Sequence, residues 1–135
     1  MANKKYDEMK HLPDGLEEAT LETLEKDAVG KPNTMSRHDL VYLTSARMMR
    51  KIDERQVRLA VHALRRKGHL VCSAPGEIGG YWLAVNWGEV DECCDHEFHS
   101  KALNLLKTES CMKMAARQLF GEAVQLGLML EKAEV

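Results

Sequence analysis

The segment Asp53–Ser73 has the sequence DERQVRLAVHALRRKGHLVCS, which predicts a helix followed by the start of a strand. Asp53 is a favourable N-cap residue, and Gln56 three positions later can complete a capping box. The helix is expected to run from Glu54 to about Lys67, because Gly68 can end it. Local signals at both ends therefore define this helix before any tertiary structure is considered.

The two faces of this predicted helix differ in chemistry. One face is apolar and is expected to enter the core, because successive helical residues turn by about 100°. Its members are Val57, Ala60, Val61 and Leu64. The opposite face is mainly basic, and it carries Arg55, Arg58, Leu59, His62 and Arg66, with Gln56 and Arg65 at its margins.

Two more helices are predicted before this segment. Residues 36–45 form a short helix with Ser36 as N-cap and Asp39 three residues later, and residues 46–51 form a tight turn. Residues 14–30 contain an earlier helix, with Asp14 as N-cap and Gly30 as the stop. The arginine-rich helix is therefore the third predicted helix, and a short turn joins it to the second.

The residues after Gly68 predict a β-hairpin and a long helix. Residues 69–73 and 81–85 are short runs rich in β-branched and aromatic residues, and the loop 74–80 between them holds one proline and three glycines. From Trp87 the chain is expected to be helical to at least Phe120, where Gly121 either stops or interrupts the helix.

This order of elements, together with GGYWLA on the second strand, resembles small winged helix-turn-helix proteins encoded by bacteriophages and prophages. The resemblance covers residues 35–85 well and the flanking helices loosely. It implies a mainly α fold with a small β-hairpin and a long C-terminal helix. It also implies binding of double-stranded DNA, with the third helix in the major groove, although winged helices also serve as protein-docking modules.

The expected organisation is a flexible N-terminal tail over residues 1–13, a winged helix-turn-helix domain over 14–86 and a helical extension over 87–135. The composition, 44% hydrophobic and 30% charged, is that of a folded globular chain. No apolar segment is long enough for a membrane span, and the first residues lack the apolar core of a signal peptide. A cytoplasmic protein with reduced cysteines is therefore expected.

Basic residues are concentrated in one part of an acidic chain. The whole chain has a net charge of −2, yet residues 35–70 hold seven of its eight arginines and two lysines against three acidic residues, which is a net +6. Arg47, Arg50 and Lys51 in the predicted turn are expected to neutralise phosphates, while the third helix contacts base edges. The alternatives are a solvated helix face or a surface for an acidic protein. The loop 74–80 carries Glu77 and neither lysine nor arginine.

The C-terminal helix has an apolar seam with a seven-residue repeat. The seam positions are Phe98, Leu105, Met112 and Leu119, and the positions four residues later are mostly alanines. A homodimer through this helix would place two recognition helices on one DNA site. The alternative is that the seam packs on the winged domain of its own chain.

The sequence predicts no metal, cofactor or catalytic site. Cys93, His96 and His99 lie near one another on the predicted helix, but no second pair of zinc ligands is evident. Ser110–Lys113 spells the S-x-x-K motif of penicillin-binding enzymes without the companion motifs. A regulator of transcription or a replication accessory is expected rather than an enzyme. A phage protein that docks on a host nucleoprotein is the other expectation.

Overall fold

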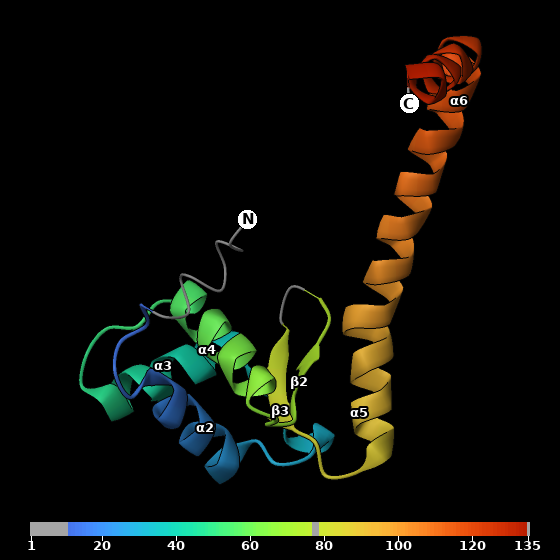
Figure 1. The fold of residues 1–135 in the computed structure, drawn as a ribbon. Helices are drawn as coiled ribbons and strands as arrows, with labels where there is room; N and C mark the ends of the chain where they lie inside the picture. The colour runs from blue at the N-terminus through green and yellow to red at the C-terminus, as the bar shows by residue number, and fades with distance from the viewer. Residues whose placement is uncertain (1–10, 77–78, 135) are drawn as a thin grey trace. The chain divides into compact units, whose positions relative to one another are not determined.

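The computed structural model describes residues 11–76 and 79–134, and the side chains of residues 11–76 and 79–121. The elements are α2 (Leu16–Asp27), η1 (Lys31–Asn33), β1 (Met35–Ser36), α3 (Arg37–Met48), α4 (Glu54–Arg66), β2 (Val71–Ala74), β3 (Gly80–Leu83), α5 (Trp87–Cys94), the π-helical segment η2 (Asp95–His99) and α6 (Ser100–Glu134) (Figure 1). The strands form one antiparallel sheet in the order β1-β3-β2. The predicted fold class, mainly α with a small β-hairpin and a long C-terminal helix, is confirmed.

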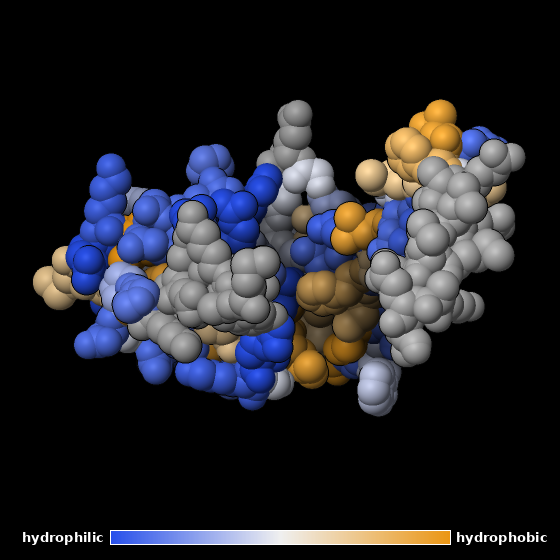
Figure 2. Space-filling model, turned by 45° about the horizontal axis from the view of Figure 1, so that its top comes forward, coloured by the Kyte–Doolittle hydropathy of each residue, from blue (hydrophilic) through white to orange (hydrophobic). Residues whose placement is uncertain are grey.

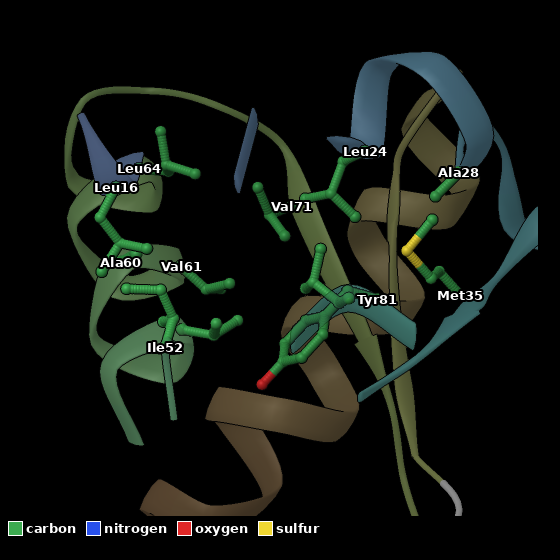
Figure 3. Packing of buried hydrophobic residues seen from close by; sticks show 12 residues of the cluster. Leu16, Leu24, Ala28, Met35, Ile52, Ala60, Val61, Leu64, Val71 and Tyr81 are labelled. Carbon is green, nitrogen blue, oxygen red and sulfur yellow. The ribbon is translucent and has the colours of Figure 1, made fainter. Parts of the chain in front are cut away.

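Helix α4 forms as its sequence predicts. Asp53 accepts from the backbone N–H of Gln56 at 2.7 Å, and the Gln56 side chain accepts from the backbone N–H of Asp53 at 3.1 Å. The capping box is therefore complete. All four predicted core residues of α4 are buried, and they meet residues from α2 and from the sheet in the main core cluster (Figure 3).

The turn before α4 is shorter than the sequence predicts. Helix α3 continues to Met48, so Arg47 belongs to a helix and not to the turn. Met49 ends the helix in a left-handed conformation with φ 53°. The Ser45 hydroxyl then accepts from the backbone N–H of Ile52 at 3.1 Å, which joins the two ends of the turn.

The buried face of helix α2 contains polar as well as apolar residues. Leu16 and Leu24 are fully buried, but so are Thr20 and Thr23, whose hydroxyls donate to carbonyls one turn earlier at 2.7 Å. These bonds satisfy the hydroxyls inside the core. The helix begins after Gly15, which has φ 84° and provides no side-chain cap. The expected N-cap at Asp14 is therefore wrong by one residue.

The predicted N-terminal tail covers residues 1–13, of which the structure describes residues 11–13. Residues 1–10 lie outside the described residues, while Leu12 packs against the main core cluster.

The sheet has a third strand that the sequence does not predict. In β1, Met35 pairs with Tyr81 and Ser36 pairs with Gly80. Ser36 is also the N-cap of α3, so this strand and that helix share a residue. A Cβ atom at Gly80 would overlap the carbonyl oxygen of Met35, and the close approach of β1 and β3 therefore requires glycine at this position.

The two faces of the sheet are covered by different helices. Val71 and Tyr81 point into the core built with α2, α3 and α4, whereas Cys72 and Trp82 form a second cluster with Cys93 of α5. This alternation is the two-residue period of a strand. Helix α5 therefore packs on the winged domain.

Glu89 joins α5 to the sheet and to η1. Its Oε1 atom accepts from the indole N–H of Trp82 at 2.8 Å and from the backbone N–H of Lys31 at 3.0 Å. Asn86 caps the helix by accepting from the backbone N–H of Glu89 at 2.9 Å. The chain divides into two compact units, one ending at Glu97 and the other beginning at Phe98.

The helical extension is continuous through η2 and α6, and Gly121 does not interrupt it. Among the described residues, none of the helices combines the length and hydrophobicity that crossing a membrane requires.

Candidate nucleic-acid interface

The outward face of α4 presents three arginines. Arg55, Arg58 and Arg66 are exposed, and His62 is half-buried. A hydropathy-coloured surface shows mostly hydrophilic side chains over the helical part of the domain and an apolar area beside it (Figure 2). Three of the five side chains predicted for the basic face are therefore exposed.

Leu59 does not belong to this exposed face. It lies opposite the core side of α4, yet only 8% of its surface is exposed, which leaves little of the side chain for the predicted contact with a thymine methyl group. The helical period places Val57 and Val61 correctly because they face the main core. It does not reveal that Leu59, on the opposite side, is buried as well.

Two residues at the margins of the face have structural partners. Arg65 donates from Nε to the carbonyl of Val71 at 2.8 Å and from Nη2 to the Ser73 hydroxyl at 3.2 Å, which ties α4 to β2. The Gln56 side chain belongs to the capping box. Neither side chain is placed as an unengaged DNA-binding group.

Of the three basic residues predicted in the turn before α4, two lie in the turn and one lies in α3. Arg50 and Lys51 are exposed in the turn before α4. Arg47 instead lies in the last turn of α3 and pairs with Glu22 of α2 at 3.6 Å. It therefore links the first two helices of the domain.

Lys67 at the end of α4 is also engaged. It pairs with Glu17 of α2 at 2.7 Å, and the hydrogen bond that the Lys67 ammonium donates to this carboxylate raises the pKa of Lys67.

Basic side chains surround Tyr81 between α4 and the sheet. Burial raises the pKa of the Tyr81 hydroxyl, and the charges of Arg65, Arg58 and Arg37 oppose this rise. Ser73, which holds Arg65, is the cross-strand partner of Tyr81, so the two side chains share a face of the sheet. The Tyr81 ring lies in the core with its hydroxyl oxygen at the edge of the cluster (Figure 3).

Arg37 is a basic residue near α4 that the helix pattern does not identify. It is the first residue of α3, and its guanidinium lies between the wing loop and the start of α4. Nη2 donates to the carbonyl of Gly76 at 3.4 Å, and Nη1 lies 3.6 Å from Oε1 of Glu54. In the sequence, Arg37 is only one of the seven arginines of the basic segment 35–70, and no motif sets it apart.

The seam residues Phe98, Leu105, Met112 and Leu119 are all exposed, as are Leu103, Leu106, Met114 and Phe120.

Cys93 does not join His96 and His99. Its side chain is buried with Cys72 and Trp82, whereas both histidines are exposed. Within residues 11–76 and 79–134, no three histidine, cysteine or acidic side chains come together in a way that could hold a metal ion.

In comparisons with protein-family models, curated proteins and solved structures, nothing matched this chain. The assignment of a function therefore depends on the surface chemistry described above.

Proposed function

We propose that this protein binds double-stranded DNA through α4 and the turn before it. The observation that carries the proposal is a row of exposed basic side chains, which begins with Arg50 and Lys51 and continues along α4 with Arg55, Arg58 and Arg66. Arginine suits this role because its planar fork donates two hydrogen bonds to guanine or to a phosphate. The protein acts as a cytoplasmic, non-catalytic regulator or replication accessory of the phage or prophage type.

The proposed contacts fall into two classes. Arg55 and Arg58 lie in the N-terminal half of α4, where a recognition helix reaches base edges in the major groove. Arg50 and Lys51 lie in the turn and contact phosphates, which fix the position of the protein without reading sequence. Binding is therefore expected to combine a sequence-specific part with a salt-dependent part.

The test begins with selection of a preferred site from random duplexes. Arg58→Ala is expected to weaken binding to that site by about 5- to 150-fold, which corresponds to roughly 1–3 kcal/mol for one bidentate base contact, and to affect unrelated duplexes less. Arg50→Ala is expected to weaken binding to all duplexes alike and to lower the salt slope by about 0.9. Lys31→Ala, which removes an exposed cation paired with Glu92 at 2.6 Å, is the control.

One observation favours a second function. Leu59 is buried and Arg65 is held by β2, so less of α4 is available for base contacts than a recognition helix usually offers. The same basic face would then dock on an acidic protein, such as a host nucleoprotein. Failure to bind any duplex near physiological salt, with intact folding, would reject DNA binding and favour this function.

We further propose that η2 and α6 form a homodimer through the seam Phe98, Leu105, Met112 and Leu119. The support is the exposure of all four apolar side chains along one seven-residue repeat. Leu105→Glu places a charge in the seam and is expected to give a folded monomer in sedimentation experiments. Lys107→Glu, a charge change outside the seam, is expected to leave the dimer intact. A monomeric parent protein would reject the dimer.

A further inference from the structure

We infer that Arg37, at the junction of the wing loop and α4, forms a binding site for one phosphate of the duplex backbone, and that Glu54 occupies its guanidinium in the free protein. The inference rests on the proposed DNA-binding function and adds a contact and a competitor that the basic face of α4 does not contain.

The position of Arg37 is fixed by the elements around it. The preceding residue, Ser36, pairs with Gly80 in the sheet and caps α3 through a hydrogen bond to the backbone N–H of Asp39 at 3.1 Å. The guanidinium lies against the wing backbone, since a Cβ atom added at Gly79 would come within 3.0 Å of the Arg37 Nε atom. The side chain is therefore held between the loop that joins β2 to β3 and the N-terminal end of α4.

Arg37 supplies a positive charge beside the loop 74–80, which we call the wing. The loop 74–80 contains no lysine or arginine, so it supplies no positive charge of its own. Arg37 donates to the Gly76 carbonyl of that loop at 3.4 Å and thereby places a positive charge beside it. A wing that approached a duplex would bring this guanidinium toward the backbone.

The contact between Arg37 and Glu54 is of a kind that a phosphate can replace. Their charged atoms are 3.6 Å apart, and the side chains are 37% and 51% exposed. Exposed ion pairs of this kind contribute little to stability. A duplex phosphate offers two oxygens to the planar fork of the arginine, and guanidinium–phosphate pairs are stronger than a solvated pair at this distance.

Glu54 acts as a competitor in this arrangement. It is the acidic residue in the first turn of α4, where its carboxylate benefits from the helix dipole but would repel an approaching phosphate. Pairing with Arg37 neutralises Glu54 in the free protein. Phosphate binding releases the carboxylate to solvent, so the free energy of the ion pair is subtracted from the free energy of DNA binding.

The test measures the dissociation constant of the full-length protein for a selected duplex, by fluorescence anisotropy between 50 and 300 mM salt. Arg37→Ala is expected to lower the salt slope by about 0.9 and the affinity by about 8-fold at 0.1 M salt, the factor that one phosphate contact contributes relative to 1 M. Glu54→Gln is expected to raise the affinity by about 1.5- to 5-fold, which is the equivalent of one exposed ion pair. Arg37→Lys is expected to keep the parent's salt slope.

The control and the contrary results separate this inference from the function on which it rests. Lys31→Ala removes an exposed, paired cation at η1 and is expected to change neither quantity. If the parent binds duplex but Arg37→Ala keeps its salt slope, Arg37 only supports the wing and the inference is overturned. An unchanged affinity in Glu54→Gln would reject the competitor role. A parent protein that binds no duplex would overturn the proposed function itself.

Discussion

Glu89→Ala is expected to destabilise the winged domain by removing the group that joins α5 to the sheet. Its Oε1 atom accepts from the Trp82 indole N–H at 2.8 Å, and only 4% of Trp82 is exposed. Without the carboxylate this buried donor has no hydrogen-bond partner, which lowers the free energy of unfolding by about 1–3 kcal/mol. Loss of a negative charge from the first turn of α5 adds about 0.3–1 kcal/mol. The backbone N–H of Lys31 is exposed and can bond to water.

The total expected loss is about 1.5–4 kcal/mol, and for a domain of this size each kcal/mol lowers the melting temperature by about 4–8 °C. Glu89→Gln keeps an oxygen acceptor and is expected to lose less than about 1 kcal/mol. In the double variant Glu89→Ala/Trp82→Phe no indole donor remains, so the double variant is expected to be more stable than the sum of the two single losses predicts.

Urea unfolding followed by circular dichroism measures the parent and the four variants without depending on tryptophan emission. The reasoning is refuted if Glu89→Ala loses less than about 0.5 kcal/mol, the usual range for surface changes. It is also refuted if the losses in the double variant are additive, because the penalty would then not come from the indole donor.

Two further predictions follow from close packing at the sheet. Gly80→Ala forces β1 and β3 apart at Met35 and is expected to destabilise the domain by about 1–3 kcal/mol in thermal unfolding, whereas Gly121→Ala has open space and is expected to stabilise α6. Burial raises the pKa of the Cys72 thiol from about 9 to about 12, and Cys93 contributes further to the rise. The stability that the protonated thiol confers below pH 9 is therefore lost as the pH rises to 12, by up to about 1.4 kcal/mol for each pH unit. Unfolding series at pH 8–11 should show that Cys72→Ala flattens this dependence, while the same change at the exposed Cys111 does not; an equal effect at both positions would contradict the prediction.

The sequence predicts α4 well because its information is local. A capping residue, its partner three residues later and an apolar face lie within one segment, and each is present in the structure. The burial of Leu59, by contrast, could not be predicted from the helical period. A helical period identifies the side of a helix that meets the main core, but whether the other side is covered depends on residues far away in the chain.

Strand β1 and the placement of Arg37 could not be predicted for a related reason. Two residues have no measurable period, and Ser36 carries the stronger signal of a helix cap. The position of Arg37 depends on Gly76 and Glu54, which the fold brings together from separate elements. In α2, threonines that bond to their own helix occupy core positions that a hydrophobicity pattern assigns to the surface.

The pairing of Met35 with Tyr81 sets the order in which the domain can fold. Helices α2, α3 and α4 are neighbours in the chain, so their contacts close short loops and can form early. The sheet is completed only when β3 returns to β1 across all of α3 and α4, which closes a much longer loop. Pairing of β1 with β3 is therefore expected to be the late, slow step of folding. In native-state hydrogen exchange, the amides of β1 should open at lower free energy than those of α4, because a two-residue strand has few bonds to lose.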